Sequence, residues 1–440
     1  MRYLRSVKTG ELCKLSYDIY PYDNTSIYER IPRIKIVIDN NYIEKVEVIL
    51  DNVVLLSTED NINCICVRPK TMLYYGKHKI QVNMFRDDER IHSVESCFYI
   101  ENPEEKYVTY YGSLHSHTSY SDGRGTPTEA YEHAMKNNLD FWFVSDHVNR
   151  LIKNNINHDK TIEVVCEEIC KWEMMKLEAE RVNSKNDNFL ALAAYELSTS
   201  FAGHINVFNN QDIPNKRKFE PLDMYEFIFH VMKNNLNIVM SINHPFRQSS
   251  TLPYSGTLNK VINLLELGNG SPPKRYIRSE KQYYEYLDNG WILGAVNGQD
   301  NHIENWGESV NVTGIMATNL NRDELINAMM KRRVFSTESR AFKILYKING
   351  YIMGSIINLN SLTPICIDLE IEDTKHPIKF VEIIINGGRT LKMFMEEKKE
   401  QIERMIVIPY DMNITWCLIK VTHIDDNLSF SSPIFFKHHK

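Results

Sequence analysis

The chain has 440 residues, of which 43% are hydrophobic, 11% are aromatic and 25% are charged. This composition is ordinary for a globular protein and gives no sign of disorder, and the length predicts two or three domains because single hydrophobic cores stop growing at about 250 to 300 residues. The formal net charge of −6 at pH 7 leaves no surplus of cations for counterion release, so we expect no general binding of nucleic acid.

The N-terminal residues Met1–Lys8 lack the apolar run of a secretory signal, and no apolar run in the chain is long enough to span a membrane. We therefore expect a soluble, cytoplasmic protein with no membrane partner. The 8 cysteines are spread thinly through the chain, which differs from the dense framework of a small secreted domain, so we expect free thiols.

Residues 1–105 alternate apolar and polar side chains, as in Arg33–Asp39, Lys45–Leu50 and Lys79–Met84. This alternation is typical of strands with one buried face. Because no helical pattern separates these strands, we expect a small antiparallel sandwich of immunoglobulin-like type. Asn102–Glu105 is predicted to be a linker.

Strands alternate with helices from about residue 106 to residue 340. Thr126, Pro127 and Glu129 supply a cap, a proline at the first helical position and the acid of a capping box, so a helix is predicted to run to Asn138. The remaining predicted helices are 160–183, 221–235, 276–288 and 322–332, and the predicted strands are 139–144, 188–197, 237–242, 261–266 and 291–296. Repeated βα units imply parallel strands, in a closed barrel or an open sheet.

Residues 341–440 return to the strand period, as in Phe380–Ile385 and Met405–Pro409. We therefore predict three domains, with boundaries at 1–105, 106–340 and 341–440, of which the first and last are small and β-sandwich-like.

Histidines and acids gather after the predicted strands of the central region. The histidines are His115, His117, His147, His204, His244 and His302, and the acids are Asp122, Asp146, Glu196, Glu266 and Asp300. In β/α folds the C-terminal ends of the strands converge on one face, so these side chains are expected to meet.

A single histidine after a strand is most often a surface residue or a structural hydrogen-bonding group. His133, His158 and His230 fall within or near predicted helices, and we interpret them as structural. His115 and His117, however, project from the same side of an extended segment, and Asp300 and His302 repeat this spacing after another strand. Coincidence at several strand ends therefore favours a metal site.

Imidazole and carboxylate groups bind zinc, manganese or iron, and the two oxygens of Glu196 could bridge two ions. Paired ions generate hydroxide near neutral pH and stabilise the attacking and leaving oxygens of a displacement. The residue types therefore predict hydrolysis.

The segment Gly112–Gly123, followed by Thr126–Pro127 and Phe143–His147, closely resembles the first two motifs of the PHP (polymerase and histidinol phosphatase) metallo-hydrolase domain. Five later segments are similar to the later motifs in order, particularly those of the carbaryl-hydrolase-like (CehA/McbA) branch: Tyr195–Glu196, Gly203–Asn206, Asn243–Pro245, Leu265–Asn269 and Gly298–His302. The resemblance covers about residues 109 to 340. Two positions depart from it, because Ser113 stands where the family usually has Asp or Asn, and Ser145 where Thr is usual.

The resemblance implies an α/β fold, with a distorted (β/α)7 TIM-like barrel flanked here by the two β-sandwich-like domains, and a site for two or three divalent ions. It implies one ion held by His115, His117, Glu196 and Asp300, a second held by Glu196, His244 and His204, and a third held by Asp122, His147 and His302. His204 could instead contact the substrate or support another ligand, and Asp146 could orient His147 or hold a metal itself.

Most members of the family cleave phosphoesters, so the leading expectation is a phosphoesterase in which hydroxide attacks phosphorus. His302 or His204 could protonate the leaving oxygen if that imidazole is not metal-bound, and Asp146 is a further catalytic candidate. The candidates for binding the anionic substrate are Arg150, Arg247, Lys274 and Arg275.

Two other function classes stay open. The same metals could hydrolyse an amide, ester or carbamate, or the domain could be a non-catalytic, metal-stabilised binding module. The expected partner is a small phosphorylated molecule, and a homo-oligomer is also compatible with the sequence.

Overall fold

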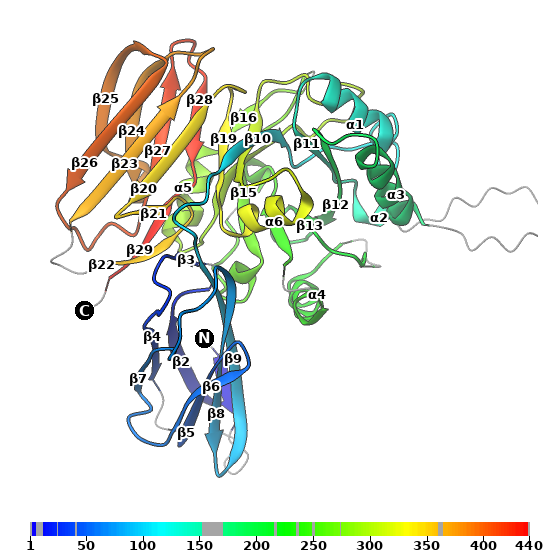
Figure 1. The fold of residues 1–440 in the computed structure, drawn as a ribbon. Helices are drawn as coiled ribbons and strands as arrows, with labels where there is room; N and C mark the ends of the chain where they lie inside the picture. The colour runs from blue at the N-terminus through cyan, green and yellow to red at the C-terminus, as the bar shows by residue number, and fades with distance from the viewer. Residues whose placement is uncertain are drawn as a thin grey trace, which may run out of the picture. The chain divides into compact units, whose positions relative to one another are not determined.

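The computed structural model describes residues 2–5, 12–23, 25–39, 42–151, 170–214, 218–234, 237–248, 251–272, 274–359 and 364–438 (Figure 1). His158 and the predicted helical residues 160–169 lie outside these ranges. The chain divides into two compact units, Met1–Glu105 and Lys106–Lys440. The separation of residues 341–440 as a third domain stays a prediction.

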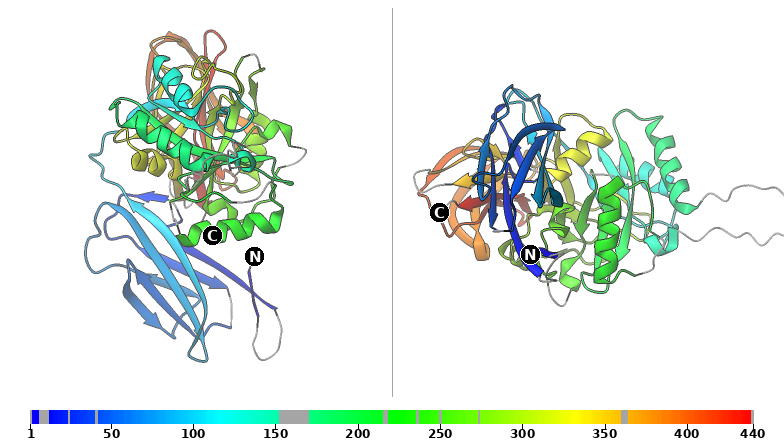
Figure 2. Two further views of the ribbon diagram at one scale, coloured as in Figure 1. Left: turned by 90° about the vertical axis from the view of Figure 1, so that its right-hand side faces the viewer. Right: turned by 90° about the horizontal axis from the view of Figure 1, so that it is seen from below.

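The N-terminal unit consists of two sheets (Figure 2). One contains β1 (Arg2–Arg5), β2 (Leu12–Tyr20), β4 (Ile34–Asp39) and β7 (Cys64–Val67), and the other contains β3 (Thr25–Ile27), β9 (Glu89–Ile100), β8 (Gly76–Arg86), β5 (Lys45–Leu50) and β6 (Val53–Thr58). Alternate residues of β4, β5 and β8 are buried, because successive side chains of a strand point to opposite faces. The strands predicted at 33–39, 45–50 and 79–84 are therefore confirmed.

Seven strands of the larger unit surround the candidate site. In order of pairing they are β10 (Val108–Ser113), β11 (Phe141–Val144), β12 (Leu190–Ser198), β13 (His204–Phe208), β14 (Val239–Ile242), β15 (Ile262–Asn269) and β17 (Gly294–Gly298). Beyond the ends of β17 and β10, Asp300 N donates to His115 O (3.0 Å) and His117 N donates to Asn301 O (2.9 Å). The segment after the last strand thus meets the segment after the first.

The helices predicted at 126–138, 221–235 and 322–332 are present to within two residues at each end. The helix predicted at 276–288 begins only at Glu280, the helix predicted at 160–183 is described from Lys171 onward, and the short helix Val148–Leu151 was not predicted. The helices of the unit are α1 (Pro127–Lys136), α2 (Val148–Leu151), α3 (Lys171–Asn183), α4 (Pro221–Asn234), α5 (Glu280–Asp288) and α6 (Arg322–Met330), with short 3₁₀ turns η1 (Pro245–Arg247) and η2 (Leu258–Lys260). The predicted capping box opens α1, because Glu129 N donates to the Thr126 hydroxyl (3.2 Å) and Thr126 N donates to the Glu129 carboxylate (2.6 Å). No helix within the described ranges is long and apolar enough to cross a membrane.

A (β/α)7 barrel, with a helix after each parallel strand, is not what the structure shows. The fold is mixed α/β, and β13, which was not predicted, runs antiparallel to both β12 and β14. The connection Thr199–Gly203 between β12 and β13 is too short for a helix, and Thr199 N donates to Gly203 O (2.8 Å) across it. A hairpin therefore adds an antiparallel strand between the predicted strand 188–197 and the predicted helix 221–235.

The sheet continues from β10 into the C-terminal part of the chain. It passes through β18 (Val312–Ala317), β19 (Val334–Thr337), β28 (Leu428–Ser431), β27 (Trp416–His423), β24 (Ile378–Ile385) and β25 (Arg389–Lys399). A four-stranded sheet is formed by β21 (Tyr351–Ile352), β20 (Lys343–Ile348), β23 (Ile365–Glu372) and β26 (Gln401–Ile408). The remaining strands are β16 (Ile277–Arg278), β22 (Ile356–Leu359) and β29 (Ile434–His438), of which β22 and β29 pair with each other.

Candidate metal centre

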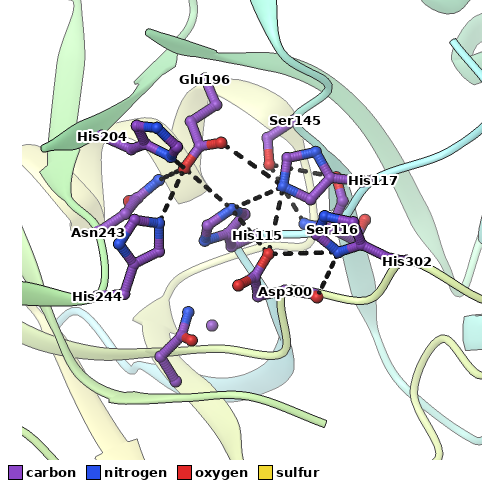
Figure 3. A network of polar contacts seen from close by, with 12 residues as sticks. His115, Ser116, His117, Ser145, Glu196, His204, Asn243, His244, Asp300 and His302 are labelled. Atoms are coloured by element: carbon purple, nitrogen blue, oxygen red, sulfur yellow. Dashed lines mark hydrogen bonds and ion pairs between the residues drawn. The ribbon is translucent and has the colours of Figure 1, made fainter. Parts of the chain in front are cut away.

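All six histidines that the sequence placed near strand ends lie in one cluster, most of which Figure 3 shows. The ring centroid of His117 lies 5.1 Å from the ring centroid of His115, 4.7 Å from that of His147 and 4.4 Å from that of His302. The ring of His204 lies 5.2 Å from His147 and 5.0 Å from His244. The predicted convergence of these imidazoles is therefore present.

The strand ends explain why residues far apart in sequence meet. His115 and His117 follow β10, His147 follows β11, and His244 follows β14. His204 is the first residue of β13, and because β13 runs antiparallel to β12, the start of β13 lies beside the end of β12. The hairpin that breaks the expected pattern thus still delivers its histidine to the cluster.

Glu196 stands at the centre of the cluster. Its Oε1 lies 3.3 Å from His115 Nε2, 3.1 Å from His204 Nδ1 and 3.4 Å from His244 Nε2, and its Oε2 lies 2.9 Å from His147 Nδ1 and 3.6 Å from His117 Nε2. Nitrogens of five imidazoles therefore surround one buried carboxylate.

Asp300 faces the histidines with one oxygen and two cations with the other. Its Oδ1 lies 3.3 Å from His117 Nε2 and 3.6 Å from His115 Nε2. Its Oδ2 lies 3.7 Å from Arg247 Nη2 and 3.7 Å from Lys274 Nζ. These two predicted substrate-binding cations are half-exposed, so they lie where the buried cluster opens to solvent.

Asp122 occupies the more open side of the cluster, with 45% of its side chain exposed. Its Oδ2 lies 3.5 Å from His302 Nε2 and 3.7 Å from His147 Nε2, and its Oδ1 lies 3.8 Å from His117 Nδ1. Four overlapping groups of side chains could each hold an ion: His115, His117 and Asp300; His117, His147 and Glu196; His117, Asp122 and His302; and Glu196, His204 and His244.

The cluster fits divalent cations for two reasons. Buried polar atoms are normally hydrogen-bonded, yet neither Glu196 Oε2 nor Asp300 Oδ2 makes a hydrogen bond of good geometry among the described residues, although His147 Nδ1 lies 2.9 Å from the first and the nearest cations lie 3.7 Å from the second. A cation would satisfy both oxygens. A mixture of imidazole nitrogens and carboxylate oxygens also suits zinc, manganese and iron.

The electrostatics of the cluster favour charged groups in spite of burial. Burial alone raises the pKa of Glu196, but the neighbouring imidazoles outweigh it and hold that pKa well below its usual value. For His115, burial lowers the pKa, but the carboxylates of Glu266 and Glu196 outweigh it and hold the pKa well above its usual value. Burial lowers the pKa of His117. The site thus binds protons as a metal-free cluster and must release them to bind a cation.

Asp146 shapes the loop that carries one of the candidate ligands. Its carboxylate accepts from Thr118 N (2.8 Å), from the Thr118 hydroxyl (2.5 Å) and from the Ser121 hydroxyl, and Asp122 follows directly. Burial raises the pKa of Asp146. It belongs to none of the four potential ligand groups of the described residues, so its contacts are those of a residue that positions Asp122.

Two predicted substrate-binding cations and two histidines interpreted as structural remain to be placed. Arg150 and Arg275 are exposed, and among the described ion pairs neither contacts a cluster carboxylate. His133 Nδ1 lies 2.7 Å from Trp306 O, and His230 is exposed on α4.

Three residues of the site were not assigned a role from the sequence. Asn243 Nδ2 donates to Glu196 Oε1 (2.9 Å), Glu266 Oε1 accepts from His115 Nδ1 (2.7 Å), and a Cβ at Gly298 would lie 1.9 Å from Glu266 Oε1. The motif segments that contain them were the available signal, but contacts between different strands cannot be read from one strand's sequence.

No protein-family model matches the chain, and no curated protein sequence matches it. A two-domain protein from Bacteroides vulgatus that contains a predicted PHP-like metal-dependent phosphoesterase is 17% identical, with 74% of this chain and 96% of that chain covered and a TM-score of 0.42. PsfC from Pseudomonas syringae is 13% identical (51% and 90% covered, TM-score 0.35), and a proposed metal-dependent phosphoesterase from Bifidobacterium adolescentis is 14% identical (50% and 95% covered, TM-score 0.28). Because these scores are low, the function is inferred from the site's own residues.

Proposed function

We propose that this protein is a metal-dependent hydrolase of phosphate esters that holds two or three zinc, manganese or iron ions in the histidine cluster. The observation that carries the proposal is the position of Glu196, whose two oxygens lie 2.9 to 3.6 Å from nitrogens of five imidazoles. A carboxylate with ligands on both sides suits a bridge between two ions. The motif resemblance to the PHP domain supports the same class.

The proposal keeps the three ion positions that the motif resemblance implies. The first would be held by His115, His117, Glu196 and Asp300, the second by Glu196, His204 and His244, and the third by Asp122, His147 and His302. The ligand groups of the structure support the second position fully and the first through His115, His117 and Asp300, whereas Asp122 and His302 group with His117, and His147 groups with His117 and Glu196. When bound, such ions supply Lewis acidity, which lowers the pKa of a water and stabilises negative charge on the oxygens of the reacting group.

The two cations at the mouth favour an anionic substrate. Arg247 and Lys274 approach Asp300 Oδ2 from outside the buried cluster, and both are exposed enough to bind a phosphate oxygen as it enters. Charge-assisted bonds from guanidinium and ammonium groups to phosphate are among the stronger hydrogen bonds in proteins. We therefore propose a phosphoester in preference to a neutral ester or amide.

Two imidazoles on the open side of the cluster are the candidates for protonating the leaving oxygen, each in a form of the site in which it does not itself hold an ion. The side chains of His204 and His302 are 31% and 25% exposed, whereas those of His115 and His117 are 0% and 1% exposed. The ammonium of Lys274 lies 2.9 Å from His302 Nδ1 and can fix the orientation of that ring. A proton donor must reach the substrate, so the buried imidazoles are not candidates.

The carbaryl-hydrolase-like branch and the barrel are also proposals. Seven paired strands, with the segments beyond the first and last joined by backbone hydrogen bonds, support a divergent form of the barrel in which β12 is followed by an antiparallel strand instead of a helix.

The decisive experiment compares substrates on one preparation of the full chain loaded with manganese or zinc. Aryl phosphate monoesters, phosphodiesters, aryl esters and aryl carbamates are supplied in turn, with Glu196→Gln as the inactive control. We expect turnover of a phosphate ester that chelator abolishes and metal restores. Turnover of only esters or carbamates would replace the phosphoesterase assignment, and the absence of bound metal would reject the hydrolase.

A further inference from the structure

Glu266 lies on β15 and is 1% exposed. Both of its oxygens accept hydrogen bonds, two from candidate metal ligands and one from a neighbouring asparagine. Oε1 accepts from His115 Nδ1 (2.7 Å), and Oε2 accepts from the backbone N of His244 (2.7 Å) and from Asn269 Nδ2 (2.9 Å). One carboxylate therefore contacts two candidate ligands that belong to different ligand groups.

The contact with His115 determines which ring nitrogen can bind a cation. Because Nδ1 donates its proton to Glu266, Nε2 is the nitrogen that can bind a cation once its own proton has left, and Nε2 faces Glu196 (3.3 Å) and Asp300 (3.6 Å). A carboxylate on the far nitrogen of a ligand imidazole fixes its tautomer and the ring orientation.

The contact with His244 is made by the backbone. His244 has φ 30° and ψ 59°, a left-handed backbone conformation that residues other than glycine rarely adopt. The hydrogen bond from His244 N to Glu266 holds this turn, which follows β14 and directs Nε2 of His244 to within 3.4 Å of Glu196 Oε1.

The position of Glu266 is itself set by a glycine on the neighbouring strand β17. A Cβ at Gly298 would lie 1.9 Å from Glu266 Oε1 and 3.0 Å from the Cβ of His115. Any side chain there would displace the carboxylate, so Gly298 is the residue that gives Glu266 its room.

We propose that Glu266 is a positioning residue that fixes two candidate ligands, the imidazole of His115 and the backbone turn of His244, and so sets the geometry of two ion positions together. This inference rests on the proposed function, because it concerns the ligands of the same ions. It assigns to one carboxylate a role in the affinity for two ions, the one held by the group with His115 and Asp300 and the one held by the group with His204 and His244.

The test is Glu266→Gln, which keeps the size of the side chain. All three partners of Glu266 are donors, so an amide can accept from His115 or from His244 and Asn269, but its NH₂ must then face a donor. We expect Co²⁺ to bind about 10- to 100-fold more weakly, with an altered visible absorption spectrum, while the circular dichroism of the metal-free protein is unchanged.

Glu338→Gln is the matched control. Glu338 is a carboxylate of the same unit, is 4% exposed, and accepts from Arg278 Nε (2.6 Å) and from Leu428 N (3.1 Å) without contacting the cluster. Its replacement should change thermal stability but not the Co²⁺ spectrum or affinity. Where Glu266→Gln does not fold, Gly298→Ala, which displaces the carboxylate without removing it, is measured in its place.

The outcomes separate the two proposals. If the unmodified protein binds no divalent ion, the metal-dependent function is wrong. If it binds Co²⁺ and Glu266→Gln, or Gly298→Ala in its place, binds it with the same affinity and spectrum, the positioning role is wrong. The same loss in Glu338→Gln would also overturn it, because the effect would then follow from the removal of any buried carboxylate.

Discussion

Replacing Glu196 by Gln removes one negative charge from the centre of the cluster and leaves the side chain's size unchanged. The depressed pKa of Glu196 means that its contribution to the stability of the metal-free protein is present above the usual carboxyl pKa and is lost as the pH falls through the lower value. Since hydrogen bonds to charged groups contribute about 1.5 to 3 kcal/mol, we expect the metal-free variant at pH 7 to be less stable by about that amount.

A second effect, of similar size, concerns the stabilisation by metal. An ion that binds only the folded protein at a thousandfold excess over its Kd stabilises it by about 4 kcal/mol. With an unfolding entropy of about 2.1 cal/mol/K per residue, the unit Lys106–Lys440 has a total unfolding entropy of roughly 0.7 kcal/mol/K. Dividing the stabilisation of about 4 kcal/mol by this entropy gives a rise in Tm of about 6 °C. If loss of the shared ligand weakens binding by about a hundredfold, only about 1.4 kcal/mol and 2 °C remain.

The assay is thermal unfolding of both proteins with chelator and with manganese or zinc. The informative quantity is the metal-induced rise in Tm of each protein, because the difference between the two metal-free proteins cancels. A rise in Glu196→Gln equal to that of the unmodified protein would refute the reasoning, since no ion would then depend on the carboxylate.

Three further predictions address protons, substrate and stoichiometry. Because the pKa values of His115 and His147 are raised in the metal-free protein, cation binding at pH 7 should release protons and should weaken as the pH falls. Calorimetry in two buffers of different ionisation enthalpy measures this release, and equal binding enthalpies in the two buffers would contradict it. Arg247→Ala should raise KM for an aryl phosphate about 10- to 100-fold and leave kcat/KM for a neutral aryl ester unchanged, and an equal loss on both substrates would exclude an anion-binding role. His204→Ala should lower the bound metal by one ion per chain in elemental analysis, and an unchanged count would leave His204 as a proton donor or substrate contact.

The parts of the fold that could be predicted are those that depend on neighbours in the chain. The capping box at Thr126 and Glu129 is local, and α1 begins where it predicts. Strand β11 is apolar throughout and buried at each position, so its short length and its flanking residues identified it. The same local patterns identified the strand ends after which most of the candidate ligands follow.

Strand β13 could not be predicted in the same way. Residues 204–208 are mostly buried, but the segment is short, and the pattern gave no reason to place a hairpin where helices had separated the earlier strands. Its antiparallel direction follows from pairing with β12 and β14, which is a tertiary property. For this reason the sequence identified the histidine at position 204 without identifying the geometry that brings it to Glu196.

The backbone conformations of two candidate ligands add an argument that no sequence pattern contained. His244 and Asp300 both have positive φ, at 30° and 49°, and such conformations cost of order 1 to 3 kcal/mol when a side chain is present. Both turns are held by hydrogen bonds to the cluster or its support, from His244 N to Glu266 Oε2 (2.7 Å) and from Asp300 N to His115 O (3.0 Å). The two strained turns direct their side chains toward the cluster, His244 toward Glu196 and Asp300 toward His117. Backbone strain of this kind is expected at a binding site, where the positions of the side chains are needed for the ligand. The backbone thus supports the same conclusion as the side chains.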